Sequence, residues 1–455
     1  MTRTQNTTNG IVEGVIWKRL LAFCFPIMLG TLFQQMYNTV DAVIVGQFVG
    51  TQALAAVGGS SAQILSLLIG FFVGMSSGAT VIVSQFYGAQ ERDGVSRAVH
   101  TAIALSIVGG AVMTVLGLVF APILLEWMNT PADTMADSAM YLRIVFMAMI
   151  PNMIYNVGSG VLRAVGDSKS PLYFLIVCCI VNVVLDLLFV LGLDMGVAGV
   201  AVATSIAQLI SAVLVCWTLS RSKDSYRLEL RKLRMDRKIL SRTLKIGFPA
   251  GIQSVMYSLS NTIITTTING FGTATVAAWV ALGKVDGLFW MILGAFGTSC
   301  TTFVGQNYGA GNYARVRKSM KTCTWMTLVA SWLFSIACFA FGKPVFRLFS
   351  SEAEVLEIAA RMLMYMAPCY WLFVPIEMVS GSLRGMGNTV TPTIITAMGI
   401  CVFRTIWMFT VVPMWHEILA ITISYPISWI LTSTAFIFYY NHVKRQLMPG
   451  EYPEK

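Results

Sequence analysis

Two aspartates lie inside apolar stretches long enough to cross a membrane. Asp41 and Asp186 occupy the stretches near residues 20–47 and 171–192. A charged side chain at the bilayer centre costs at least a few kcal/mol unless it is paired, hydrated or functional. Asn182 precedes Asp186 by one turn, so the two side chains share a helix face. Carboxylate and amide oxygens in this arrangement suit a proton or a hard cation such as Na⁺.

The second half of the chain repeats the first half. The recurring landmarks are Gln85 to Ala89 with Gln306 to Ala310, Leu162-Arg163 with Leu383-Arg384, and Phe25-Pro26 with Phe248-Pro249. The first two pairs lie 221 positions apart and the third pair 223 positions apart, so the register drifts by two residues. A repeat of this length is typical of secondary transporters, because solenoid repeats run to about 20 to 50 residues.

The candidate carboxylates occur in one half only. Asp41 corresponds to Ile264, while Asn182 and Asp186 correspond to Phe403 and Trp407. A polar contact that the fold itself requires should recur in both halves. The asymmetry favours a functional site, and the alternative is that these residues only pin two helices together.

Composition indicates an integral membrane protein. Hydrophobic residues make up 56% of the chain and charged residues 11%, with a mean hydropathy of +0.71, whereas a soluble protein carries about 25% charged residues. Apolar runs of about 20 residues or more predict an all-α fold of twelve spans, six in each half. The expected spans are 20–47, 53–86, 98–125, 139–162, 171–192, 196–219, 244–270, 275–305, 319–349, 360–383, 391–414 and 418–440.

The chain has a formal net charge of +10, and its basic residues are distributed as in a membrane protein. Lys and Arg fall in alternate connections, with Lys343 and Arg347 as the exception, and the opposite connections at 46–53, 126–138, 192–196 and 270–275 have neither. The positive-inside rule then predicts a multi-pass protein of the cell (inner) membrane with both termini cytoplasmic. This distribution explains the charge without nucleic-acid binding.

A basic connector divides the chain into an N-lobe (1–220), a cytoplasmic linker (221–245) and a C-lobe (246–455). The linker holds ten Lys or Arg against three acidic residues. We favour a topology signal and solvated tether, and the alternative is a regulatory segment that binds anionic lipid headgroups.

No pattern for metal, redox or nucleotide chemistry is present. The nine cysteines form no CxxC pair, and the three histidines lie near span ends without clustering. The chain has no GxxxxGK[ST] loop for ATP. We therefore expect no enzyme activity, no cofactor and no metal beyond Na⁺, so that an ion gradient must drive any uphill transport.

The chain resembles the multidrug and toxic compound extrusion (MATE) transporters along essentially its whole length. The resemblance rests on Tyr37 to Asp41, on Gln85-x-Tyr87-Gly88-Ala89, on Leu162-Arg163-x-x-Gly166-Asp167, and on the repeats of the latter two. It implies twelve helices in two six-helix lobes around a central cleft. It also implies export of amphipathic, often cationic, drug-like molecules in exchange for H⁺ or Na⁺.

The resemblance also implies an N-lobe cation site. The positions that match the family pattern are Asp41, Asn156, Asn182, Asp186 and Thr204. Counted at ~1.5 Å per residue, Asp41 and Asp186 fall in the outward half of the membrane and Asn156 nearer its middle. Some family members carry an acidic residue where this chain has Tyr257, so a C-lobe cation site of that kind is not expected.

The C-lobe spans contain other charges, namely Lys284, Asp286, Glu377 and Arg404. Pairing of Glu377 with Arg404 would neutralise two costly groups. Either a packing role or a substrate-binding role fits these residues.

Prolines Pro26 and Pro249 lie near the starts of equivalent helices and predict kinks. Our hypothesis is that cation binding at Asp41 and Asp186 changes the bend of the first helix and releases the drug outside, whereas static kinks are the alternative. The expected partners are a small drug-like molecule and membrane lipids, and the protein is expected to act as a monomer. The alternative function is a flippase for lipid-linked precursors with a related fold.

Overall fold

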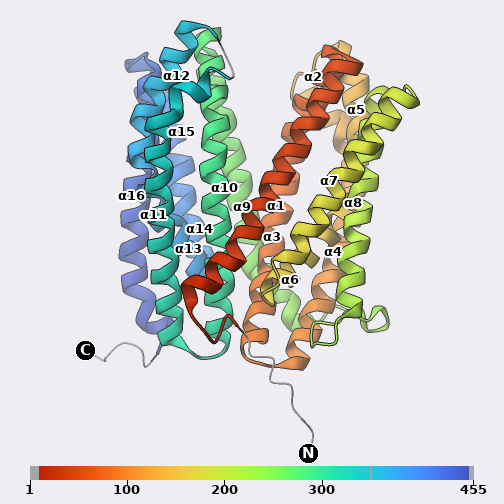
Figure 1. Cartoon of the computed structure of the whole chain (residues 1–455), viewed down its shortest axis with the longest axis vertical. Helices are drawn as coiled ribbons and strands as arrows, with labels where there is room; N and C mark the ends of the chain where they lie inside the picture. Colours follow the sequence, from red (N-terminus) through yellow and green to blue (C-terminus); the bar gives the residue numbers. More distant parts are fainter. Residues whose placement is uncertain (1–9, 349–350, 450–455) are drawn as a thin grey trace, which may run out of the picture. The chain divides into compact units, whose positions relative to one another are not determined.

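The computed structural model describes residues 10–348 and 351–449, and these form helices without any strand (Figure 1). The helices of the first half are α1 (Ile16–Ile44), α2 (Thr51–Gly58), α3 (Ser60–Gly88), α4 (Arg92–Trp127), α5 (Ala132–Met147), α6 (Met149–Ala164), α7 (Lys169–Leu187) and α8 (Gly196–Arg221). Those of the second half are α9 (Arg237–Asn269), α10 (Thr273–Gly309), α11 (Tyr313–Phe346), α12 (Ala353–Met366), α13 (Val374–Gly385), α14 (Val390–Thr396), α15 (Phe403–Met414) and α16 (Ile418–Leu447). The predicted all-α fold is confirmed.

Each of the twelve expected spans corresponds to one long helical segment. Ten segments in the described part of the chain are long and apolar enough to cross a membrane, and the bent pair α5–α6 forms an eleventh. The twelfth segment is α9, with 33 residues. The last residue of the expected span 319–349 lies outside the described residues.

Helix α9 is polar for a membrane-spanning helix, but four of its threonine hydroxyls are satisfied within the helix. Thr262, Thr265, Thr266 and Thr267 each donate a hydrogen bond to the backbone carbonyl four residues earlier, at 2.9–3.0 Å. Such bonds satisfy the hydroxyl without a partner on another helix. Length and repeat register therefore identify this span where hydropathy alone does not.

The fourth span is broken between α5 and α6, whose axes differ by 51°. Pro151 lies in the first turn of α6. Proline has no backbone N–H to donate, and its ring clashes with the carbonyl four residues earlier, which belongs to Met147 at the end of α5. Pro151 therefore explains the position of the break.

Contacts divide the chain into two compact units. Among the described residues, unit 1 comprises 10–24, 252–348 and 351–449, and unit 2 comprises Phe25–Gly251. Both boundaries fall inside helices, next to Pro26 in α1 and Pro249 in α9. Each of these two helices therefore begins in one unit and continues in the other.

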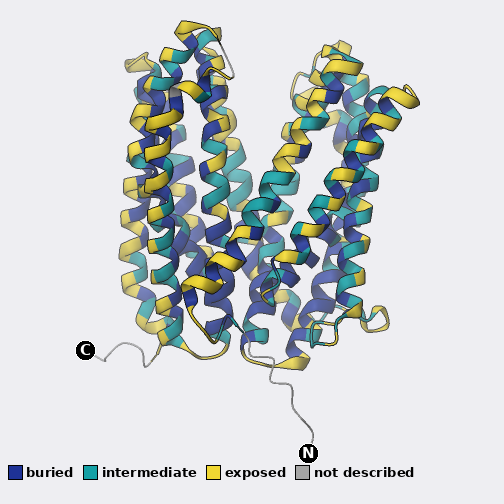
Figure 2. Cartoon of the chain, viewed as in Figure 1, coloured by how far each residue is buried: buried dark blue, intermediate teal, exposed yellow. Residues whose placement is uncertain are grey.

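In unit 2, the start of α9 packs against α3 through glycines. A Cβ atom at Gly78 would collide with the backbone of Thr243 and Gly247, and one at Gly247 would collide with the backbone of Met75. Small residues allow helices in membranes to approach closely. Figure 2 shows the dense burial of residues around these helices.

Unit 1 contains the corresponding contact between the start of α1 and α10. Cys24 lies within hydrogen-bonding reach of Ser299, and Phe23 packs edge-on against Phe303 with ring centroids 5.8 Å apart. Cys24 precedes Gly247 by 223 positions, and Ser299 follows Gly78 by 221. The same helix contact is therefore built twice with different side chains.

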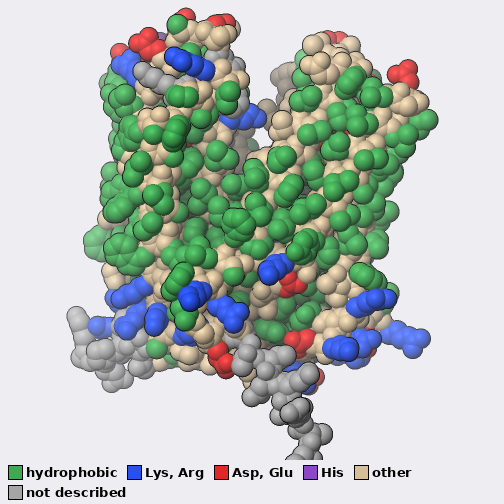
Figure 3. Space-filling view, viewed as in Figure 1, with side chains coloured by type: hydrophobic (Ala, Val, Ile, Leu, Met, Phe, Trp, Pro, Cys, Tyr) green, Lys and Arg blue, Asp and Glu red, His purple; other side chains and the backbone are tan. Residues whose placement is uncertain are grey.

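The basic connector is docked on unit 2 and differs from the solvated tether that we favoured. Leu228 is 2% exposed and belongs to the main apolar core of the unit. The Tyr87 hydroxyl donates to Asp224 Oδ2 at 3.2 Å, and the Glu229 N–H donates to His100 Nε2 at 3.1 Å. The basic side chains of the connector stay exposed, and Figure 3 shows Lys and Arg gathered at this end of unit 2.

Replacement of Gly247 by alanine tests the close contact between α9 and α3. We expect Gly247→Ala to lower the stability by about 1–3 kcal/mol, because the new methyl group overpacks the contact. The measurement is the thermal melting of the detergent-purified protein. The matched control is Gly283→Ala, at a helical position where a Cβ meets open space. Equal melting temperatures of the two variants would contradict the contact.

Candidate functional site

Two of the predicted site residues meet in unit 2. Asp41 lies on α1, and Asp186 lies on α7 with no exposure to solvent (0%). Their carboxyl groups lie close enough to share a proton, although two ionised carboxylates make no hydrogen bond with each other. Asn182 is also fully buried, one turn before Asp186 on the same helix. α8, which packs along α7, carries Thr204.

Buried oxygens of these residues lack a hydrogen-bond partner among the described residues. They are Asp41 Oδ1, Asn182 Oδ1, Asp186 Oδ1 and Oδ2, and Thr204 Oγ1. Buried polar groups almost always have partners, and an unsatisfied one costs about 1–3 kcal/mol. An oxygen-rich set of this kind fits a proton or a hard cation.

The ligand set favours a monovalent ion over a divalent one. Only two carboxylates take part, and no group of three His, Cys, Asp or Glu residues is placed to hold a metal within the described ranges. Removing one shared proton or one Na⁺ leaves the two carboxylates facing each other, and repulsion between like charges then opposes the contact. Occupancy of the site is thus linked to the packing of α1 on α7.

Each carboxylate is followed within one or two turns by a widened, π-helical turn. Val45–Val49 continues α1 after Asp41, and Leu188–Gly192 continues α7 after Asp186. Turns of this kind are frequent at functional sites because they shift the register of the helix. The residue types do not reveal them, so sequence analysis missed this feature.

Two tyrosines that were not predicted as site residues lie near the carboxylates. Tyr141 of α5 is close enough to interact electrostatically with both Asp41 and Asp186. Tyr37, one turn before Asp41 on α1, is 9% exposed and interacts with Asp41 and Tyr141. The spacing of Tyr37 from Asp41 was a signal that could have identified it. The position of Tyr141 depends on tertiary packing.

Asn156 is oriented within its own helix. Its Nδ2 group donates to the Asn152 carbonyl at 2.9 Å and to Asn152 Oδ1 at 3.0 Å. These hydrogen bonds do not run to Asp41 or Asp186. The role of Asn156 as a cation ligand therefore stays a prediction that rests on resemblance.

Unit 1 fills the equivalent positions with apolar and aromatic side chains. Ile264 is 1% exposed. Phe403 packs against Trp407 with ring centroids 5.6 Å apart, and Trp407 Nε1 donates to the Ala420 carbonyl at 2.9 Å. The structure thus gives the counterparts of the site ordinary packing roles.

Arg404 and Glu377 form no ion pair, so the pairing that we considered is wrong. Arg404 Nε donates to Ser428 Oγ at 2.9 Å, and its guanidinium carbon lies 3.8 Å from the ring centre of Tyr425. Glu377 instead packs closely against Gly297 of α10 and interacts electrostatically with Arg384. Stacking on an aromatic ring stabilises a buried guanidinium without a carboxylate in contact.

The remaining two charges of this lobe differ in their surroundings. Asp286 accepts a hydrogen bond from the Tyr370 hydroxyl, and it interacts electrostatically with Arg404. Lys284 is exposed, although it lies only two residues earlier on α10. Asp286, which is partly buried, and the buried Arg404 therefore belong to one polar cluster, and Lys284 does not.

The helix repeat and the buried carboxylate pair define the class of the protein as a two-lobed membrane transporter. The MatE family model matches residues 26–188 and again residues 249–410. The chain belongs to this family, the multidrug and toxic compound extrusion transporters. The double match confirms the predicted repeat of two pseudo-symmetric halves, while the compact units differ from the predicted lobes because each exchanges a helix start with the other half.

Similar proteins cover nearly the whole chain. "Probable multidrug resistance protein YoeA" of Bacillus subtilis (strain 168) is 29% identical over 442 residues, which cover 95% of each chain. The "FAD transporter" of Shewanella oneidensis is 24% identical and aligns with 77% of this chain and 78% of its own length. A solved structure described as MATE in the bent conformation has a TM-score of 0.90 at 20% identity, covering 97% of this chain and 98% of its own.

Replacement of Arg404 tests the polar cluster of unit 1. We expect Arg404→Met to lower the stability by about 3 kcal/mol, because Asp286 loses its compensating charge and Ser428 loses a donor. The measurement is the melting temperature of the purified protein. Lys284→Met is the control for loss of an exposed positive charge on the same lobe and should melt like the wild type. Identical melting of both variants would argue against a structural role of Arg404.

Proposed function

We propose that this chain exports amphipathic, often cationic, small molecules and takes up H⁺ or Na⁺ in exchange. The observation that carries the proposal is the set of unpartnered buried oxygens around Asp41 and Asp186. A packing contact alone would leave these atoms unsatisfied at considerable cost. In the proposed cycle, a proton or cation enters from outside and leaves to the cytoplasm. While it is bound, it offsets the cost of burying these unsatisfied oxygens.

Coupling requires that occupancy of the site biases one conformation over another. Asp41 lies on α1, which also contains Pro26. With the site occupied, the two carboxylates attract the ion and hold α1 on α7. With the site empty, their repulsion weakens this contact, and the helix has a proline at which to bend. Transport then follows alternating access.

The proposal also includes a topology, an oligomeric state and a substrate class. Both termini and the connector lie in the cytoplasm, in agreement with the placement of Lys and Arg. The protein acts as a monomer in the inner membrane and needs no cofactor other than the coupling ion. Names of relatives such as the multidrug export protein MepA of Staphylococcus saprophyticus support a drug-like substrate.

Ethidium efflux from proteoliposomes tests the proposal under separately imposed proton and sodium gradients. We expect the wild type to export ethidium under one of the two gradients. The efflux rate should fall at least about tenfold in Asp41→Asn and in Asp186→Asn, because an amide can neither exchange a proton nor carry the charge. The control is Asp194→Asn in an exposed loop, where asparagine tolerates the positive φ of 51°. Efflux that persists in both site variants, or its absence under every gradient, would contradict the proposal, and the second result would favour a flippase.

Thr204→Val separates the two ions, because it removes a hydroxyl oxygen and keeps the side-chain volume. Na⁺ needs several oxygen ligands, whereas a proton needs only a carboxylate. For Na⁺ coupling we expect the Na⁺ concentration at half-maximal efflux to rise by about tenfold, because the loss of one oxygen ligand costs roughly as much free energy as the loss of one hydrogen bond. For H⁺ coupling the pH dependence of efflux should stay as in the wild type. A titration of efflux against Na⁺ and against pH measures both.

A further inference from the structure

The starts of α1 and α9 are each held by an arginine from a different helix of the same unit. These are the two helices that begin in one unit and continue in the other. Neither arginine belongs to the carboxylate site or to the cluster around Arg404. Their placement suggests a role in transport that does not involve substrate contact.

In unit 1, Arg315 of α11 binds the segment that precedes α1. Its guanidinium donates to the Ile11 carbonyl from Nε at 3.2 Å and from Nη2 at 3.1 Å, and to the Gly14 carbonyl from Nη2 at 2.8 Å. Glu13 between them adds an electrostatic attraction. Ile11 and Ile16 are 6% and 4% exposed, so the segment is packed as well as hydrogen-bonded.

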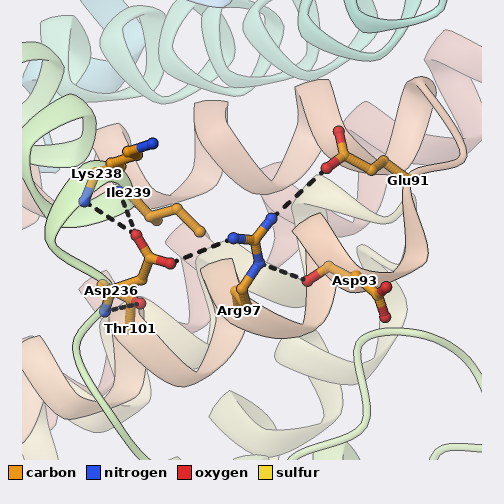
Figure 4. A network of polar contacts seen from close by, with 7 residues as sticks. All are labelled: Glu91, Asp93, Arg97, Thr101, Asp236, Lys238 and Ile239. Atoms are coloured by element: carbon orange, nitrogen blue, oxygen red, sulfur yellow. Dashed lines mark hydrogen bonds and ion pairs between the residues drawn. The ribbon is translucent and has the colours of Figure 1, made fainter.

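In unit 2, Arg97 of α4 binds the residue that precedes α9. Arg97 Nη1 lies 3.4 Å from Asp236 Oδ2, and its Nη2 lies 3.7 Å from Glu91 Oε1 (Figure 4). The Asp236 N–H donates to Thr101 Oγ1 at 3.1 Å. Hydrogen bonds from the N–H groups of Ile239 and Lys238, together with Arg97, lower the pKa of Asp236, so this carboxyl is charged at neutral pH.

The two contacts occupy corresponding places in the repeat. Glu13 and Asp236 each precede the helix proline, Pro26 or Pro249, by thirteen positions. Arg97 and Arg315 lie in the first two turns of α4 and α11, whose starts are 221 positions apart. The arginines occupy different positions within these turns and bind different acceptors. The shared feature is therefore the anchoring of a helix start, rather than a repeated residue.

We propose that Arg97 and Arg315 are positioning residues of the transport cycle, which anchor the starts of α9 and α1 so that bending at Pro249 and Pro26 moves the remainder of each helix. A helix whose start is free can absorb a change in bend by fraying at its end. A helix whose start is fixed cannot fray in this way, so a change in the bend must move the part of the helix that follows the proline. This inference rests on the proposed transport function.

The chemistry predicts unequal effects of the two arginines. Arg315 makes three charge-assisted hydrogen bonds with backbone carbonyls, and such bonds are stronger than neutral ones. Arg97 is 44% exposed and its ion pairs are screened by solvent. Loss of Arg315 should therefore disturb α1 more than loss of Arg97 disturbs α9.

The test combines hydrogen exchange with transport kinetics in the full-length protein. The variants are Arg315→Gln, Arg97→Gln and Asp236→Asn. Asp236→Asn removes the charge that Arg97 binds but keeps an oxygen that accepts from the Lys238 and Ile239 N–H groups. The matched controls are Lys318→Gln on α11 and Arg92→Gln on α4, both exposed positive residues near the anchors.

We expect Arg315→Gln to speed amide exchange at residues 11–20 and to lower the maximal efflux rate about tenfold, with KM within about twofold of the wild type, since the residue does not touch substrate. Arg97→Gln and Asp236→Asn should act alike at residues 237–246, with a smaller loss of about threefold. Arg315→Lys should recover part of the rate because the charge is kept. The controls should match the wild type in both measurements.

If the variants show faster amide exchange at the helix starts but an unchanged efflux rate, the arginines only stabilise local structure and the proposal is wrong. Unchanged exchange would show that the contacts do not hold the helix starts.

The exchange of residues 27–40, compared with and without Na⁺ and at two pH values, supplies a readout that needs no transported substrate. If the wild type fails to export ethidium, the proposed substrate class fails. The anchoring proposal then stands or falls on whether Arg315→Gln abolishes the ion-dependent change in exchange.

Discussion

The contact between the carboxyl groups of Asp41 and Asp186 is the constraint on which the rest of unit 2 depends. Two carboxylates within hydrogen-bonding reach repel each other unless a proton or cation lies between them. Their surroundings are apolar helices, so solvent does not screen that repulsion as it would at a surface. In the proposed function, the packing of α1 on α7 is therefore sensitive to one ion. α8 and α5 contribute the hydroxyl and phenol groups near the two carboxylates.

Unit 1 shows that the same helical framework does not need such a site. The counterparts of Asn182 and Asp186 are Phe403 and Trp407, which pack together and satisfy the one indole N–H through a backbone carbonyl. Two charges of unit 1 have protein partners instead, Asp286 the Tyr370 hydroxyl and Arg404 Nε the Ser428 hydroxyl, with the Arg404 guanidinium over the Tyr425 ring and its Nη2 left without a hydrogen-bond partner. Charges with permanent partners stabilise one arrangement, whereas unpartnered charges respond to an ion.

The sequence predicted the framework because hydropathy and the repeat depend only on residue type and spacing. All twelve spans agree with helical segments, including α9, whose polar composition hides it from hydropathy. The partner of Arg404 was not predictable, because Tyr425 and Ser428 lie more than twenty positions away and only packing selects them over Glu377. The docking of the connector was missed for the same reason, since it depends on tertiary contacts of Leu228, His100 and Tyr87.

The connectivity of α1 offers a direct route from the ion site to the other unit. Asp41 lies on the part of α1 that belongs to unit 2, Pro26 lies at the boundary, and the start of the helix belongs to unit 1. In the proposed cycle, a change at Asp41 would reach unit 1 along one continuous helix, because α1 crosses the boundary between the units. Such a route transmits force only if the far end is fixed, and the three hydrogen bonds of Arg315 provide that fixed end. In the proposed transport cycle, the candidate ion site, the proline and the anchored start would therefore act together along a single helix.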